Sequence, residues 1–402
     1  MNVSNVPIEG RCTGCRACEQ ICGVQAITFG YNEFGFLQPI INERCTQCGL
    51  CLSVCPAKSM RSELFHNINQ CYIAYAKNKR RALNSASGGA FIVIADRFLS
   101  RYKGIVYGCC MDEQFNVFHA GTDNAEELVR FQGSKYVQSN PENSYNSVKN
   151  ELQKGRHVLY TGTPCQIAGL KMFLKRDWDN LYTVDLVCHG VPSQISFKKY
   201  IKYLEADIGE QIQSFRFRNR NIFDASGYLI KVKYKNGKTF KCEAVEDLYF
   251  RAFSKNMSLN KACYQCGYAQ SERLGDITIG DSAAAGVLGI YRFEPKSSIM
   301  INSDKGEELW DLIKDDLIYT EIDKTVELER NRQLSAPSPC FENRDTVCRL
   351  MAEGKFGELN KQYPLDRKKH FNIHDITAKI PMVIKKPVFY VLSAVYRFIK
   401  NR

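Results

Sequence analysis

The feature that most constrains this chain is a run of cysteines that occurs twice near the N-terminus. Both runs have the spacing C-x2-C-x2-C-x3-C: Cys12, Cys15, Cys18 and Cys22, then Cys45, Cys48, Cys51 and Cys55. Dense disulfide scaffolds are typical of short secreted chains, whereas this chain has 402 residues and crowds its cysteines at one end. The repeat therefore predicts metal binding in a small N-terminal module.

The spacing favours iron–sulfur clusters over zinc. Three cysteines at i, i+3 and i+6 on a tight loop are typical of a [4Fe-4S] cluster, and zinc knuckles usually lack the third cysteine. In bacterial two-cluster ferredoxins the fourth cysteine of each run binds the other cluster. We therefore assign two crossed sets of ligands: Cys12, Cys15, Cys18 and Cys55 for one cluster, and Cys45, Cys48, Cys51 and Cys22 for the other.

Composition excludes several classes of protein. With 44% hydrophobic and 24% charged residues, the chain resembles a globular protein rather than a disordered or fibrous one. No signal peptide is evident, and no apolar run reaches the ~18 to 20 residues of a membrane-spanning helix, so we expect a cytoplasmic location. The net charge of +12 comes without a nucleic-acid-binding signature. A nucleic-acid partner is not expected.

The chain after the cysteine module alternates buried strands with helices. Apolar runs predict strands at 104–108, 157–161 and 181–187, and helical spacing predicts helices at 91–101 and 167–176. This alternation indicates an α/β domain.

Two hairpins are also expected. One lies between the cysteine runs, at 26–39, and the other at 231–241, where the chain turns at Asn236-Gly237. The second is interpreted as an insertion or an edge ribbon. The predicted fold is therefore α+β in three parts: a two-cluster ferredoxin module at 1–66, an α/β domain at 67–360 and a basic amphipathic tail at 361–402.

Ten cysteines lie outside the module. Six are interpreted as small buried hydrophobes, the usual role of a free cysteine: Cys71, Cys109, Cys110, Cys242, Cys340 and Cys348. Four lie in loops after predicted strands or in a C-x2-C pair: Cys165, Cys188, Cys263 and Cys266. Those four thiols either meet in one site or are isolated core residues, and their spacing alone does not decide between these alternatives.

Five motifs in order give the chain a family resemblance. They are Ser87-Gly-Gly-Ala-Phe, Gly133-Ser-Lys-Tyr-Val-Gln-Ser, Thr161-Gly-Thr-Pro-Cys-Gln-Ile-Ala-Gly-Leu, Asp185-Leu-Val-Cys-His-Gly-Val-Pro-Ser, and Cys263-x2-Cys266 followed by Gly275-Asp-Ile-Thr-Ile-Gly-Asp. The chain resembles the coenzyme F420 hydrogenase/dehydrogenase beta-subunit family in the form with an N-terminal two-cluster ferredoxin module. The resemblance implies FAD, a third [4Fe-4S] cluster at Cys165, Cys188, Cys263 and Cys266, and electron transfer between a deazaflavin and a partner. Relatives also include chlorophyll-derivative reductases, so the fold does not fix the substrate.

Flavin binding requires groups for a pyrophosphate and for the edge of the ring. Ser87, Gly88 and Gly89 precede a predicted helix at Ala90, where free N–H groups can bind an anion, although a glycine pair there is often only a turn. Ser134 and Lys135 are candidates for the phosphate or the flavin ring, with a solvated lysine as the alternative. His189 either donates to a cluster or flavin or is an ordinary loop histidine.

Two departures from the family pattern bear on the substrate and the partner. Many relatives have Phe-Trp-Gly after the Gly275–Asp281 run, where this chain has Ser282-Ala-Ala-Ala-Gly, so a different pocket is expected. Ten basic and two acidic residues lie in 361–402, and a helix is expected at 388–400. That helix either docks on the domain or lies on an anionic membrane surface.

These features predict a flavin- and iron-sulfur-dependent oxidoreductase. It would move electrons between a hydride carrier or organic substrate at FAD, such as a deazaflavin, and a one-electron carrier or partner oxidoreductase. The alternatives are a ferredoxin-dependent reductase of an organic substrate in cell-envelope glycan biosynthesis, with peripheral membrane contact through the tail, and a flavin-free electron-relay subunit. No Ser/His/Asp arrangement or carboxylate pair stands out, which suits chemistry carried by cofactors.

Overall fold

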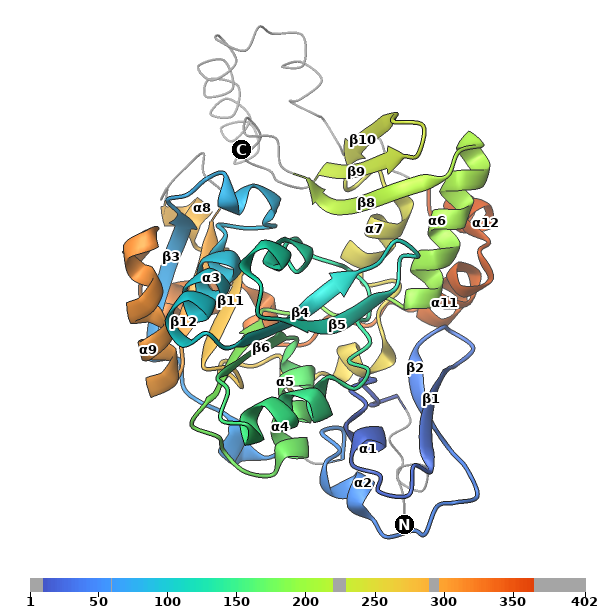
Figure 1. The fold of residues 1–402 in the computed structure, drawn as a ribbon. Coiled ribbons are helices and arrows are strands. Elements are labelled where there is room, and N and C mark those ends of the chain that lie inside the picture. The colour runs from blue at the N-terminus through green and yellow to red at the C-terminus, as the bar shows by residue number, and fades with distance from the viewer. Residues whose placement is uncertain (1–9, 59, 220–228, 289–295, 365–402) are drawn as a thin grey trace, which may run out of the picture.

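The computed structural model describes residues 10–58, 60–219, 229–288 and 296–364 (Figure 1). A small N-terminal module lies beside a larger α/β domain. Among the described residues, no helix is long and apolar enough to span a bilayer. The expected helix at 388–400 lies outside the described residues.

The N-terminal module consists of two short helices and a hairpin: α1 (Ala17–Gln20), α2 (Leu50–Ser53), β1 (Ile27–Tyr31) and β2 (Leu37–Ile41). The strands pair antiparallel with Ile27 opposite Ile41, as predicted. In each cysteine run the residue before the second cysteine and the residue after it have positive φ. These residues are Gly14 and Arg16 in the first run, and Gln47 and Gly49 in the second. The sequence repeat is therefore also a repeat of loop conformation.

An eight-stranded sheet forms the centre of the larger domain. Its order is β13-β3-β12-β11-β7-β6-β4-β5, and the neighbours β11, β7, β6 and β4 are parallel. The bounds are β3 (Gln70–Ala76), β4 (Ile105–Met111), β5 (Val117–Thr122), β6 (Val158–Gly162), β7 (Leu181–Leu186), β11 (Ile277–Asp281), β12 (Ser297–Ile301) and β13 (Leu317–Glu321). The three strands predicted from apolar runs are β4, β6 and β7.

Helices cover both faces of this sheet: α3 (Ala90–Tyr102) and α9 (Asp304–Ile313) pack on one face, and α4 (Ser144–Gln153) and α5 (Pro164–Leu174) on the other. Residues of β6 alternate between the two cores, with Leu159 facing α3 and with Val158 and Tyr160 facing α4 and α5. Burial on both faces explains why the central strands read as continuous apolar runs.

The polar hairpin predicted at 231–241 is present, with Gly237 at φ 86° in its turn. It does not extend the main sheet. It belongs to a separate three-stranded sheet of β8 (Ile212–Asn219), β9 (Leu229–Tyr234) and β10 (Thr239–Glu243). This sheet forms its own core with four helices: α6 (Gln194–Ile208), α7 (Leu248–Ser254), α11 (Arg344–Glu353) and α12 (Phe356–Gln362). The remaining helices are α8 (Ala285–Leu288), α10 (Lys324–Arg330) and the 3-10 turns Ser62–Leu64, Arg81–Asn84, Ala125–Arg130, Lys261–Gln265, Lys314–Asp316 and Arg332–Leu334.

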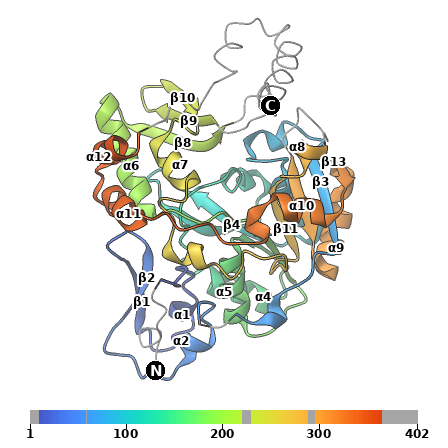
Figure 2. The same ribbon diagram turned by 180° about the vertical axis from the view of Figure 1, so that it is seen from behind.

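The N-terminal module docks on the side of the domain formed by α4 and α5, as the two opposite views show (Figures 1 and 2). Arg16 Nη1 donates to Asn140 Oδ1 at 2.8 Å, and Gln20 Oε1 accepts from the backbone N–H of Asn146 at 3.0 Å. Gln138 donates to the carbonyl of Thr13 at 3.1 Å. These bonds hold the first cysteine run against the domain.

Candidate iron–sulfur sites

The first candidate site, site I, is a cavity lined by Cys12, Cys15, Cys18 and Cys55. These are the four thiols that the crossed assignment places together. Burial raises the pKa of the Cys12 thiol to about 11, and a hydrogen bond from the backbone N–H of Gly14 opposes that rise. Backbone N–H groups also donate to Cys15 and Cys55, from Ala17 and Ala57. Such donors stabilise thiolates, so this donor set fits a [4Fe-4S] cluster.

The second set, site II, consists of Cys22, Cys45, Cys48 and Cys51. Cys22 and Cys51 pack in the same small core as Cys18 and Cys55, and Cys22 Sγ accepts from the backbone N–H of Ala26 at 3.3 Å. Cys48 is exposed. Site II therefore borders site I on one side and solvent on the other. Its ligand assignment stays a prediction.

The third candidate site, site III, is a cavity in the larger domain lined by Cys165, Cys188, Cys263 and Cys266. Cys165 lies in the first turn of α5, directly after β6, and Cys188 follows β7. These two strands are parallel neighbours with Gly162 opposite Asp185, so their carboxyl ends open on the same edge of the sheet. The segment around Lys261–Gln265 brings the remaining two thiols to that edge. The structure thus gathers four cysteines from three segments that are far apart in sequence.

Backbone donors distinguish site III from ordinary core thiols. The N–H groups of Gly190 and Tyr268, each two residues after a cysteine, hydrogen bond to Cys188 and Cys266, as Gly14 and Ala17 do in site I. Val191 donates to Cys263 in the same way. For four other thiols, two buried and two half-buried, no backbone donor is found within the described ranges: Cys71, Cys348, Cys109 and Cys242.

Neither cavity has the geometry of a single-ion site. In the part of the chain that the structure describes, no three His, Cys, Asp or Glu side chains come close enough to hold one metal ion. Zinc draws its four ligands to about 2.0–2.3 Å from one centre. A [4Fe-4S] cube separates its thiolates more widely, to roughly 7 Å, because each binds a different iron. Thiols spread around a cavity fit the second arrangement.

Sites I and III share a wall. Thr13 lines both cavities. Tyr268, which lines site III, donates its hydroxyl to the carbonyl of Pro56 at 3.3 Å, next to Cys55 of site I. Asn260, also in the wall of site III, donates to the carbonyl of Cys12 at 3.3 Å. Sequence reasoning missed Tyr268 and Asn260 because their partners lie 212 and 248 residues away, and no local signal exists for such contacts.

Gly169, on the helix that begins beside Cys165, packs closely against Cys15 of site I. A Cβ atom at Gly169 would lie 3.1 Å from Cys15 Sγ and 2.9 Å from Tyr145 Oη. We expect Gly169→Ala to displace the site I loop and to make site I release iron several-fold faster to a chelator under anaerobic conditions. Gly357→Ala is the matched control, because nothing lies within 4 Å of its added Cβ. Equal release from both variants would contradict this close packing of the helix against site I.

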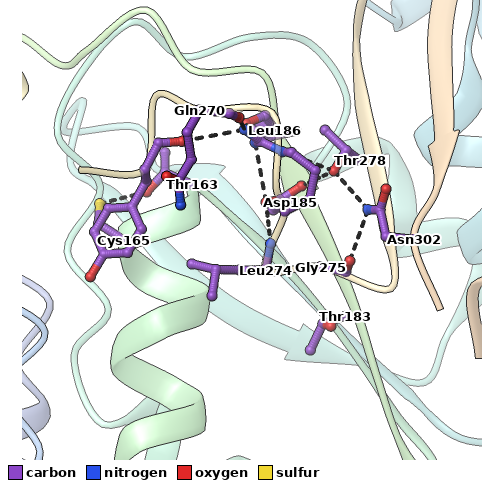
Figure 3. A network of polar contacts seen from close by, with 12 residues as sticks. Thr163, Cys165, Thr183, Asp185, Leu186, Gln270, Leu274, Gly275, Thr278 and Asn302 are labelled. Atoms are coloured by element: carbon purple, nitrogen blue, oxygen red, sulfur yellow. Dashed lines mark hydrogen bonds and ion pairs between the residues drawn. The ribbon is translucent and has the colours of Figure 1, made fainter. Parts of the chain in front are cut away.

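A buried ion pair between Arg273 and Asp185 borders site III. Figure 3 labels Asp185 with Thr278 beside it, and Cys165 in the same network. Arg273 Nη2 lies 3.2 Å from Asp185 Oδ2, with side chains 2% and 0% exposed. Arg273 also donates to Thr278 Oγ1 at 3.2 Å and to the carbonyls of Tyr268 and Gln270 at 3.3 and 3.2 Å. Asp185 accepts from the hydroxyl of Thr278 as well. The pair therefore joins the end of β7, the start of β11 and the loop after Cys266. Arg273 was not predicted from the sequence.

The residues expected to bind the flavin phosphate have other roles in the structure. The helix predicted at Ala90 begins there, but a Cβ at Gly88 would lie 2.2 Å from the carbonyl oxygen of Ala74, so this glycine allows close packing on β3. Gly89 has φ 91°, which favours glycine at the start of the helix. Ser87 Oγ donates to the carbonyl of Lys296.

The second group of expected flavin contacts is also engaged within the protein. Lys135 Nζ donates to the carbonyls of Cys109, Arg130 and Gln132 at 2.9, 3.0 and 3.1 Å. These bonds use all three of its donors, so neither a phosphate contact nor a solvated lysine describes it. Ser134 hydrogen bonds to the Tyr136 hydroxyl. As they stand, these residues do not fit a flavin phosphate site.

His189 is the expected cofactor residue that does border a candidate site. It lines site III, its Nδ1 lies 3.0 Å from Gln333 Nε2, and its ring contacts Phe253 edge-to-face with centroids 4.9 Å apart. Burial lowers the pKa of its imidazole, so the ring is neutral at neutral pH. A contact from His189 to the cluster stays a prediction.

The Ser282-Ala-Ala-Ala departure serves packing. Ala284 and Ala285 are buried against Ile73, beneath α10. The buried carboxylate of Glu327, on α10, accepts from the backbone N–H of Ala283 at 2.8 Å and from Ser282 Oγ at 3.0 Å. Small side chains here let α10 approach the sheet. The expectation of a different pocket stays a prediction.

The fold and the cysteine sites define an iron–sulfur electron-transfer oxidoreductase. Comparison with protein families gives the particular relationship. Residues 155–325 match the family described as the C terminus of the beta subunit of coenzyme F420 hydrogenase/dehydrogenase, and residues 11–59 match the "4Fe-4S dicluster domain". The resemblance found in the motifs is therefore confirmed over these two regions: residues 11–59 match a dicluster domain and residues 155–325 match the C-terminal part of this beta-subunit family.

Solved structures and curated proteins add less. Among solved structures, the chain is similar to one described as "Xenon derivatization of the F420-reducing [NiFe] hydrogenase complex from Methanosarcina barkeri", with 16% sequence identity and a TM-score of 0.46. That match covers 78% of this chain and 97% of the other, and at this TM-score it adds no argument about function. Comparison with curated proteins gave no match.

Proposed function

We propose that the protein moves electrons between a hydride carrier or organic substrate and a one-electron partner, through three [4Fe-4S] clusters held at sites I, II and III. The observation that carries this proposal is the gathering of Cys165, Cys188, Cys263 and Cys266 around one cavity that shares a wall with site I. The clusters supply one-electron transfer when bound. The chain supplies the thiolates, the N–H donors and the exclusion of water.

The three sites differ in burial in a way that orders them. Site II includes the exposed thiol Cys48, whereas the four thiols that line site III are all half-buried. Site I lies between them, because it shares a core with site II and a wall with site III. We infer that the external one-electron partner docks near Cys48 and that the organic substrate reacts on the site III side.

FAD belongs to this proposal through the family resemblance alone. A hydride carries two electrons and a cluster accepts one, so a group that converts between the two is needed at the substrate. The residues that the sequence predicted to bind FAD use their hydrogen-bond donors within the protein. The favoured substrate is a deazaflavin of the F420 type, and the alternative is another organic molecule reduced in cell-envelope glycan assembly.

Anaerobic mixing with reduced deazaflavin tests this function. We expect the visible absorbance of the clusters to bleach, and acid extraction to release about one FAD per chain, if the substrate and cofactor proposals are both right. Bleaching by dithionite but not by reduced deazaflavin would reject F420-type substrates. Intact clusters without extractable flavin would instead support the electron-relay subunit.

The basic tail and the cellular location stay predictions. Arg367, Lys368 and Lys369 and the expected helix at 388–400 lie outside the described residues. Peripheral attachment to an anionic membrane face in the cytoplasm is therefore proposed from the charge pattern of the sequence alone.

A further inference from the structure

We propose that Arg273 sets the reduction potential of the site III cluster, holding it above the value that the same four thiolates would give without a cation. This inference rests on the proposed function, because it presupposes a cluster at site III. It assigns a positioning and electrostatic role to a residue outside the cysteine set.

The orientation of the ion pair carries the argument. Arg273 lines the site III cavity, whereas Asp185 does not, so the pair presents its positive end to the four thiols. The same field acts on the thiols themselves: burial raises the pKa of Cys188 and Cys266, and the charge of Arg273 opposes that rise. A cluster gains one negative charge on reduction. A fixed cation at the cavity wall therefore favours the reduced form.

Burial makes this charge effective. The Arg273 and Asp185 side chains are 2% and 0% exposed, so little water screens them. Site I also has an arginine in its wall, Arg16, but that residue and its partner Glu19 are 16% and 24% exposed. Solvent weakens the second pair more than the first. The two sites thus have the same thiolate chemistry and differ in the strength of the adjacent cation.

Arg273 also has a structural role that the test must separate from its charge. Its guanidinium donates to the carbonyls of Tyr268 and Gln270, which fixes the loop after Cys266. Lysine at this position keeps the charge and loses the planar set of donors, while glutamine loses the charge. Asp185→Asn keeps the shape of the strand end and removes the opposing negative charge.

The experiment is a potentiometric titration of the full chain, purified anaerobically, with each cluster followed by electron paramagnetic resonance. We expect Arg273→Gln to make one-electron reduction of one cluster about tenfold less favourable, a downward shift of about 59 mV, with the other two unchanged. Asp185→Asn should shift the same cluster upward, and Arg273→Lys should restore most of the original value. Arg251→Gln, another buried arginine outside both cavities, should change none of the three.

Opposite shifts in Arg273→Gln and Asp185→Asn support the proposal, because a purely structural role has no reason to give them opposite signs. Shifts of the same sign, or unchanged potentials with all the iron retained, would overturn it. If Arg273→Gln loses the cluster, Asp185→Asn decides: an upward shift of that cluster, with Arg273→Lys near the original potential, supports the proposal, and a downward shift or none overturns it. Absence of a third cluster in the unaltered protein would instead reject the proposed function, before any variant is measured.

Discussion

Replacing Cys188 by alanine is expected to lower the iron content of the anaerobically purified protein from about twelve atoms per chain to about eight. Cys188 is one of the four thiols lining site III, and its loss leaves a buried cluster with three ligands. Electron transfer from the organic substrate to the N-terminal clusters should be lost with it. Iron analysis and anaerobic stopped-flow absorbance measure these two effects.

Cys348→Ala is the matched control for this variant. Cys348 is a buried thiol, 2% exposed, that lies in the second core, away from both cavities. It should keep about twelve irons. If Cys188→Ala also keeps about twelve irons, the thiols of site III are isolated core residues, and the proposal of a third cluster is wrong.

Replacing Cys48 by alanine should remove the outer cluster and interrupt exchange with the one-electron partner. We expect loss of about four irons and a fall of at least tenfold in the rate of electron transfer to an external acceptor. Reduction of the site III cluster from the substrate side should continue, because Cys48 lines neither site III nor site I. A melting curve of each variant separates these effects from misfolding.

Cys340→Ala provides the comparison for an exposed cysteine. Cys340 is exposed like Cys48, yet it has no neighbouring cysteine run. Its replacement should leave both iron content and acceptor reduction unchanged. Equal losses in both variants would indicate oxidative damage at the surface, and would remove the argument that partners dock near site II.

The sequence predicted the parts of the fold that depend on local spacing. The hairpin at 26–39, the strands β4, β6 and β7, and the hairpin at Asn236-Gly237 were predicted correctly because apolar runs and turn residues act over a few neighbours. Helix α5 begins at Pro164, three residues before the predicted start, because Thr163 and Gln166 form a capping box around it. The hydrophobic pattern alone does not contain that signal.

The residues of the candidate sites divide in the same way, into those that a sequence pattern predicts and those that only the tertiary fold brings there. The crossed assignment predicted that Cys55 lies with Cys12, because a repeat implies symmetry. The parallel strands predicted that Cys188 lies near Cys165. Arg273, Tyr268 and Asn260 could not be predicted, because their roles depend on partners placed by the tertiary fold. Lys135 shows the reverse case, in which a local pattern does not reveal the hydrogen bonds that the fold gives a side chain. The sequence places this lysine beside glycine and serine, a pattern typical of an anion-binding site. In the structure its ammonium donates to three backbone carbonyls.

The central claim is that this chain holds three [4Fe-4S] clusters, one of them in the larger domain. Its most direct test is the iron and acid-labile sulfide content of the unaltered protein, purified anaerobically and normalised to protein by amino-acid analysis. Twelve irons and twelve sulfides per chain are the result that the three sites predict, to within about one atom of each. About eight of each would contradict the claim, leaving only the two clusters of the N-terminal module.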